Sequence, residues 1–149
     1  MARTVVVLLR LALAGIFIYA GWAKLYPTAN VFKFMMDISS YRLLPEWSIE
    51  PLAYFLPPFE IVLGLWLLTG WQLRFSALAS GLLLCGFWLA MFITYMRGIE
   101  ANCGCGFGEE PISPRTLTRD GAMVVGAAFL MVYAWRAARR RTLATPATA

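Results

Sequence analysis

The sequence predicts an all-α integral membrane protein, a four-helix bundle with a short amphipathic interfacial helix between the first two spans. Of its 149 residues, 60% are hydrophobic and only 14% are charged, whereas soluble domains average about 45–50% and about 25%. The apolar residues also gather into four segments, and a helix needs about 20 such residues to cross a bilayer. We expect one membrane domain over residues 1–141 and a flexible tail over 142–149.

The expected spans are residues 5–25, 51–71, 75–96 and 114–138. Arg10 interrupts the first, but it lies near the start, where a long side chain can extend to the interface. We take this segment as a retained helix, because Arg10 breaks the apolar run that a signal peptide needs. The fourth span has a shorter apolar stretch, yet Ser113 and Pro114 are typical of the N-cap and first turn of a helix that begins outside the membrane.

A short helix is expected between the first two spans. Its apolar residues recur at i, i+3, i+4 and i+7, with Lys33 and Asp37 off that stripe: Val31, Phe34, Met35 and Ile38. This spacing is typical of an amphipathic helix that lies on a membrane surface. It either anchors the chain at the interface or takes a direct part in substrate contact.

The basic residues predict the orientation. With four spans, both termini and the 70–74 turn share one side, which carries seven basic residues and no acidic ones: Arg3, Arg10, Arg74, Arg136, Arg139, Arg140 and Arg141. The other side carries six basic and seven acidic residues. Because short basic loops stay cytoplasmic, we predict a multi-pass protein of the bacterial inner (cytoplasmic) membrane with both termini cytoplasmic. The net charge of +5 then reflects topology, and no nucleic-acid partner is inferred.

The loop before the fourth span contains the motif Cys103-Gly104-Cys105-Gly106, which the orientation places on the oxidising, extracytoplasmic side. The chain has no histidine and three cysteines, so we predict no metal site and no imidazole chemistry. Two cysteines one residue apart close a strained, easily reduced ring, which suits thiol-disulfide exchange. A loop-stabilising disulfide or an inert pair stays open. We take Cys103 and Cys105 as candidate catalytic residues and expect Cys85 to be a small buried hydrophobe.

Glu60 is the second candidate site. It lies roughly 13 Å into a ~30 Å hydrocarbon layer, where a carboxylate must be paired, hydrated or protonated. Pro57 and Pro58 just before it predict a kink. Glu60 therefore either lines a polar cavity, as a proton or head-group site, or bonds to a polar residue and fixes helix packing.

Three other polar residues are expected on the same outer side as the thiols: Lys24, Arg119 and Asp120. They either support the site or simply cap helices and mark the interface. Arg119 is close enough in sequence to lower a thiol pKa, whereas nearby glutamates would raise it.

An ordered set of short motifs runs along the chain: Ala20-Gly21-Trp22-Ala23-Lys24-Leu25, Tyr41-Arg42-Leu43-Leu44-Pro45, Leu56-Pro57-Pro58-Phe59-Glu60, Cys103-Gly104-Cys105-Gly106-Phe107-Gly108 and Arg119-Asp120. On four spans, this set resembles the MauE branch of the DoxX-like membrane proteins, to about Arg136. Many relatives read Cys-Gly-Cys-Phe-Gly, whereas here Gly106 is inserted before Phe107.

The resemblance implies a DoxX-like four-helix bundle linked to thiol-disulfide traffic, as in MauE-type maturation of methylamine dehydrogenase. It implies the lipid bilayer and an extracytoplasmic thioredoxin-like or cysteine-rich protein as partners, with subunits of a larger membrane complex and quinone as further candidates. The alternatives are a non-catalytic anchor or assembly subunit of a larger redox complex, and a small transporter built around Glu60.

Overall fold

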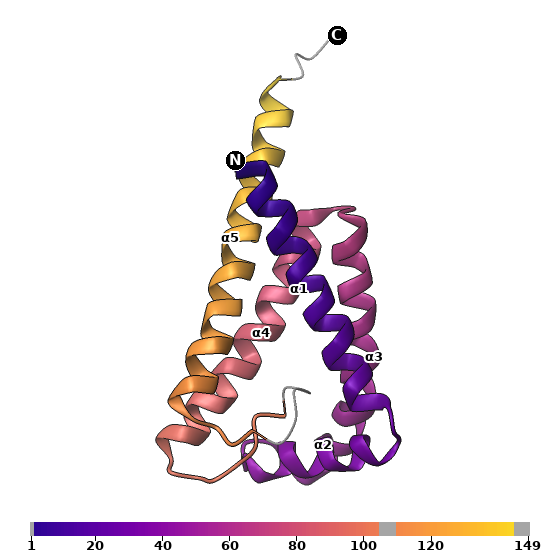
Figure 1. The fold of residues 1–149 in the computed structure, drawn as a ribbon, viewed down its shortest axis with the longest axis vertical. Coiled ribbons are helices and arrows are strands. Elements are labelled where there is room, and N and C mark those ends of the chain that lie inside the picture. The colour runs from indigo at the N-terminus through magenta and orange to yellow at the C-terminus, as the bar shows by residue number, and fades with distance from the viewer. Residues whose placement is uncertain (1, 105–109, 145–149) are drawn as a thin grey trace.

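The structure, a computed structural model, is a bundle of long helices (Figure 1). It describes residues 2–104 and 110–144; residues 1, 105–109 and 145–149 lie outside the described part. Within the described part there are five helices: α1 (Ala2–Leu25), α2 (Ala29–Ser40), α3 (Glu46–Thr69), α4 (Leu73–Met96) and α5 (Pro114–Ala144). Of these, α1, α3, α4 and α5 are long and apolar enough to cross a membrane. The prediction of an all-α membrane bundle is confirmed.

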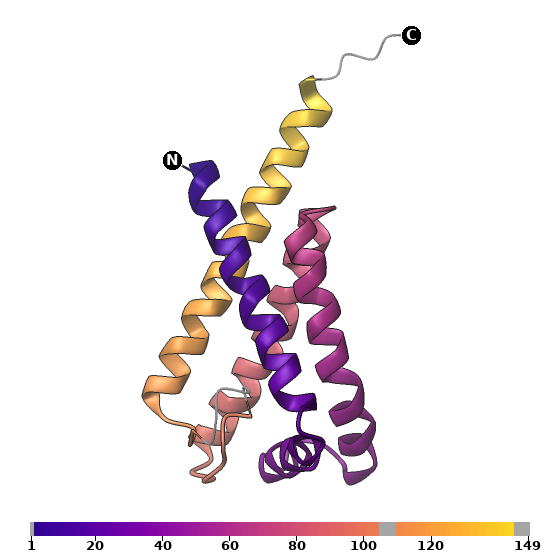
Figure 2. The same cartoon turned by 45° about the vertical axis from the view of Figure 1, so that its right-hand side comes forward.

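The two ends of the bundle differ in what they carry. The start of α1, the end of α5 and the α3–α4 turn lie at one end, the terminal end, as Figures 1 and 2 both show. At the other end α2 lies across the bundle beside the loop that joins α4 to α5. We call this the α2 end. The loop that contains Cys103 lies at this end.

All four long helices extend beyond the predicted spans. α1 begins at Ala2 and α4 at Leu73, three and two residues before their expected starts. α3 begins at Glu46, five residues before the expected start at residue 51, and it stays helical through Pro51, Pro57 and Pro58. The hydropathy of the sequence missed this first turn because helix formation does not end where apolar residues end. α5 runs to Ala144, into the segment expected as a tail from residue 142.

The start of α5 follows the predicted capping pattern. The Ser113 hydroxyl accepts a hydrogen bond from the Thr116 amide at 3.3 Å, which is the N-cap to N3 contact. Pro114 occupies the first helical position, where its missing amide hydrogen costs nothing. The N-cap prediction is confirmed.

Small residues bring α1 against α3. A Cβ atom added to Gly21 would lie 2.6 Å from the Pro57 carbonyl oxygen, and one added to Gly64 would lie 2.9 Å from the Ala14 carbonyl oxygen. Close backbone approach at small residues is how helices associate in membranes, where apolar burial alone gives little net gain. α1 therefore packs mainly on α3, while α4 packs mainly on α5.

The amphipathic character of α2 is confirmed. Val31, Phe34 and Ile38 are buried, and Phe34 and Ile38 pack in a cluster with Ile49 and Ala53 of α3. The helix covers the end of the bundle with this apolar stripe. Its other face is left toward the loop and the exterior.

Candidate functional site

In the loop between α4 and α5, Cys103 lies in one of two short antiparallel segments that are joined by main-chain hydrogen bonds. The Cys103 amide donates a hydrogen bond to the Glu110 carbonyl oxygen at 2.8 Å, and the Ile112 amide donates one to the Ala101 carbonyl oxygen at 2.9 Å. These bonds run between antiparallel segments, with a bridge between residues 102 and 111. Main-chain hydrogen bonds between residues 101–103 and 110–112 therefore position Cys103.

Cys103 is disulfide-bonded and only 3% exposed. Cys85 is a half-buried free thiol in α4. Cys105, the other member of the predicted pair, lies outside the described residues. A bulky protein thiol cannot reach a sulfur enclosed to this degree, so Cys103 is the inner member of whatever disulfide it forms.

Tyr41, directly after α2, supports the loop from the other side. Its hydroxyl donates to the Cys103 carbonyl oxygen at 2.6 Å and lies 3.0 Å from the Asn102 carbonyl oxygen. Burial raises the pKa of the Tyr41 phenol, and the negative charges of Asp37 and Asp120 raise it further. The phenol therefore stays neutral and remains a hydrogen-bond donor at any physiological pH.

Charged groups surround the Cys103 sulfur. Arg119 Nη2 lies 3.8 Å from Cys103 Sγ, and Arg119 also bonds through Nη1 to Glu110 Oε2 at 2.7 Å and through Nε to Asp120 Oδ1 at 3.1 Å. The second Asp120 oxygen, Oδ2, lies 3.5 Å from Cys103 Sγ. A sulfur of a disulfide carries no proton, so this contact becomes a hydrogen bond only when Cys103 is a thiol.

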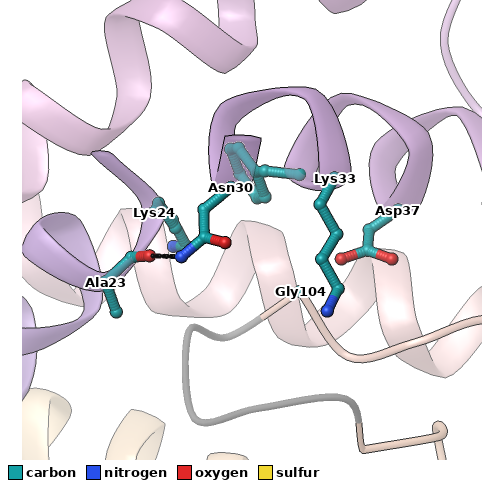
Figure 3. Close-up of a pocket in the computed structure, with 7 residues that line it drawn as sticks. Ala23, Lys24, Asn30, Lys33, Asp37 and Gly104 are labelled. Atoms are coloured by element: carbon teal, nitrogen blue, oxygen red, sulfur yellow. Dashed lines mark hydrogen bonds between the residues drawn. The ribbon is translucent and has the colours of Figure 1, made fainter. Parts of the chain in front are cut away.

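A small cavity of about 80 Å³ lies beside the loop at Gly104. Gly104 has φ +64°, a left-handed conformation that favours glycine. Figure 3 shows Lys33 and Asp37 extending from α2 toward this point of the loop, while the Asn30 amide donates to the Ala23 carbonyl oxygen at 2.7 Å. Polar side chains of α2 thus separate the cysteine loop from the end of α1.

Lys24 and Glu60 form a buried ion pair below this cavity. Lys24 Nζ lies 2.7 and 2.8 Å from the two Glu60 carboxylate oxygens, and both side chains are 5% exposed. The ammonium also lies 4.8 Å from the centre of the Phe34 ring and 5.3 Å from that of Phe87. Groups from α1, α3, α2 and α4 therefore meet at one pair of charges. Of the two alternatives for Glu60, this arrangement supplies the polar partner that fixes helix packing.

The structure gathers the predicted site residues into two groups. One group consists of Cys103, Arg119 and Asp120. The other is the ion pair of Lys24 and Glu60. Lys24 also borders the cavity at Gly104. Reasoning from the sequence missed the contribution of Tyr41 and Asp37. The signal was their spacing: Asp37 and Tyr41 are four residues apart, in the last turn of α2 and at its C-cap, where side chains four apart are neighbours.

The described residues offer little for a bound metal or quinone. Among them no group of three or more His, Cys, Asp or Glu side chains is placed to hold a metal ion. A quinone near Glu60 would need hydrogen-bond donors for its carbonyl oxygens, and the donor at this position, Lys24 Nζ, already bonds to both Glu60 oxygens. No electron step is assigned through a quinone.

Comparison with known proteins identifies the family of this chain. No curated protein and no solved structure matches the chain. A family described as "Methylamine utilisation protein MauE" matches residues 2–137, which is most of the sequence, from the start of α1 into α5. Together with the helical bundle, this match confirms the predicted resemblance, and the chain belongs to the MauE family.

Proposed function

We propose that this protein is a thiol-disulfide exchange protein of the bacterial inner membrane that serves methylamine utilisation. Family membership supports the biological setting. The observation that carries the redox proposal is the environment of Cys103: a disulfide-bonded, enclosed sulfur with an arginine and a carboxylate within 4 Å. A merely structural disulfide needs neither group, whereas an exchanging thiol needs its thiolate stabilised.

In this proposal Cys103 and Cys105 cycle between dithiol and disulfide. The α2 end faces the extracytoplasmic side, in keeping with the charge bias of the sequence. The partner is an extracytoplasmic thioredoxin-like or cysteine-rich protein, such as a disulfide-rich subunit during maturation. The Lys24–Glu60 pair supports the site by holding α1, α2 and α3 together beneath the loop.

Mass-tag labelling of thiols tests the redox proposal. Membranes are treated with a maleimide mass tag before and after reduction, using Cys85→Ser so that only the loop cysteines report. Both loop thiols should become reactive together after reduction, and a thiol-bearing partner protein should produce the same change. A pair that is already fully reduced in native membranes contradicts the proposal.

A second test separates exchange from a non-catalytic anchoring or assembly role. The double variant Cys103→Ser/Cys105→Ser is compared with a deletion strain and with Cys85→Ser as the matched control. We expect the double variant to fail, and Cys85→Ser to succeed, in restoring the growth of the deletion strain on methylamine. Full rescue by the double variant would establish the anchoring role instead.

A further inference from the structure

The contacts of Asp120 point to a role that the sequence motif did not specify. Asp120 is 7% exposed in α5, and its two oxygens make different contacts: Oδ1 accepts from Arg119 Nε at 3.1 Å, and Oδ2 lies 3.5 Å from Cys103 Sγ. One oxygen is thus held in place and the other faces the sulfur. This is the geometry of a positioned proton donor or acceptor, which must lie near hydrogen-bond reach of the reacting atom.

Arg119 completes the arrangement. Its guanidinium is held by the Glu110 carboxylate at 2.7 Å and the Asp120 carboxylate at 3.1 Å, and its third nitrogen, Nη2, lies 3.8 Å from Cys103 Sγ. A positive charge fixed at this distance favours the thiolate form of a cysteine. The sulfur therefore faces a cation that stabilises negative charge and a carboxyl group that can exchange a proton.

We infer that Asp120 is the proton donor and acceptor of Cys103 during exchange, with Arg119 stabilising the Cys103 thiolate. This inference rests on the proposed function and assigns the chemistry of its inner sulfur. Among residues 2–104 and 110–144, the charged or titratable groups around Asp120 include Arg119 on the same helix, Glu110 and Cys103 on the loop, and Tyr41 at the end of α2. From α4, the buried neighbour of Cys103 is the apolar Met91.

Reduction of the Cys103 disulfide by a partner dithiol takes two exchange steps. A partner thiolate attacks the sulfur bonded to Cys103, because Cys103 itself is enclosed. A new S–S bond forms between the partner and that sulfur, the old S–S bond breaks, and Cys103 leaves with the electron pair as a thiolate beside Arg119. Protonated Asp120 then gives its proton to Cys103 Sγ. The partner's second thiol, as a thiolate, then attacks the partner's own sulfur in the mixed disulfide. A disulfide forms within the partner, and the loop sulfur leaves as a thiolate and takes a proton from solvent. Two electrons thus pass from the partner dithiol to this protein.

The reverse direction uses the same groups. When the protein is the reductant, the Asp120 carboxylate takes the proton from the Cys103 thiol. The resulting thiolate attacks the mixed disulfide and releases the partner thiolate. Because one carboxyl group serves both directions, Asp120 affects the rate of exchange and its dependence on pH whichever way electrons flow.

The test measures reduction of the purified, detergent-solubilised protein by dithiothreitol. The rate constant is divided by the fraction of dithiothreitol present as thiolate, over roughly pH 5 to 9, since a general acid contributes only while it is protonated. For the wild type we expect this corrected constant to fall as the pH rises. For Asp120→Asn we expect a constant that is flat with pH and, at the acid end, lower by on the order of 100-fold.

Two further variants control for structure. Asp120→Glu keeps the carboxyl group and should restore the slope with pH, which a purely structural role for Asp120 would not require. Glu100→Gln removes an exposed carboxylate from the same loop and should leave the wild-type profile unchanged. If Asp120→Asn fails to fold, the wild-type profile still decides, because a constant that is flat with pH in the wild type overturns the inference.

The outcome also separates this inference from the proposed function. If the wild type exchanges with dithiothreitol and Asp120→Asn shows the same rate and slope, the role of Asp120 is wrong and the exchange proposal stands. If the wild-type disulfide resists dithiothreitol over the whole range, the exchange proposal itself fails.

Discussion

At the level of single residues, a buried pair of opposite charges joins α1 to α3. The side chains of Lys24 and Glu60 are both 5% exposed, and Lys24 Nζ contacts both carboxylate oxygens of Glu60. An unpaired charge in a membrane-spanning helix is costly, so each residue requires the other. The faces of the Phe34 and Phe87 rings add favourable contacts to the ammonium.

Breaking this pair should destabilise the protein more than removing it. We expect Lys24→Met to lower the free energy of unfolding by on the order of 3–5 kcal/mol, because it leaves Glu60 buried without a partner. The double variant Lys24→Met/Glu60→Leu should recover much of that loss. Unfolding by sodium dodecyl sulfate in mixed micelles measures both, with the exposed Glu46→Gln of α3 as the control.

An equal decrease in the free energy of unfolding in the single and double variants would contradict this expectation. It would show that Lys24 contributes packing of its aliphatic stem rather than charge compensation. The Cys103 loop would be affected indirectly in either case, since Lys24 borders the cavity at Gly104.

At the scale of helices, the α1–α3 contact positions the ion pair. Gly21 and Gly64 let the two backbones approach so closely that a methyl group at either position would meet carbonyl oxygen or backbone nitrogen of the other helix. Gly21 lies one turn before Lys24, and Pro57 lies one turn before Glu60. The close approach therefore sets the separation of the two charges.

We expect Gly21→Ala to lower the free energy of unfolding by about 1–3 kcal/mol, the usual cost of overpacking. Gly15→Ala is the matched control on the same helix, because its added Cβ would meet nothing within 4 Å. The same detergent unfolding experiment compares them. A Gly21→Ala variant as stable as Gly15→Ala would mean that α1 and α3 are less tightly packed than the structure has them.

At the scale of the whole molecule, the exterior is that of a protein in lipid. Large apolar side chains on the spans are exposed, among them Leu8 at 61%, Leu82 at 66% and Val125 at 69%. A soluble protein rarely presents so much contiguous apolar surface. The bundle is therefore solvated by hydrocarbon, and its polar site residues collect at the α2 end.

The predicted orientation can be tested by labelling from outside the cell. In a background of Cys85→Ser/Cys103→Ser/Cys105→Ser, a membrane-impermeant maleimide should label Glu46→Cys in cells with a permeabilised outer membrane. Arg3→Cys should be labelled only after the inner membrane is lysed, because basic termini stay cytoplasmic. Both positions are exposed in the structure. The opposite pattern would place the cysteine loop in the cytoplasm.

More of the fold than of the candidate site could be predicted from the sequence. The helical membrane bundle, the interfacial helix and the N-cap at Ser113 followed from local patterns, since hydropathy, periodicity and capping depend on neighbours in the chain. The role of Glu60 was left between a polar cavity and a bond that fixes helix packing. The contacts of Tyr41 and Asp120 with Cys103 were not predicted, because each joins residues far apart in the sequence.

The four membrane helices could be inferred from hydropathy alone, because a chain segment crosses lipid only as an apolar helix that satisfies its own backbone bonds. That Lys24 is the partner of Glu60, and that Asp120 and Arg119 contact Cys103, is visible only in the folded bundle. These contacts arise where separate helices converge, and helix crossing depends on the fit of small residues between backbones rather than on any local pattern.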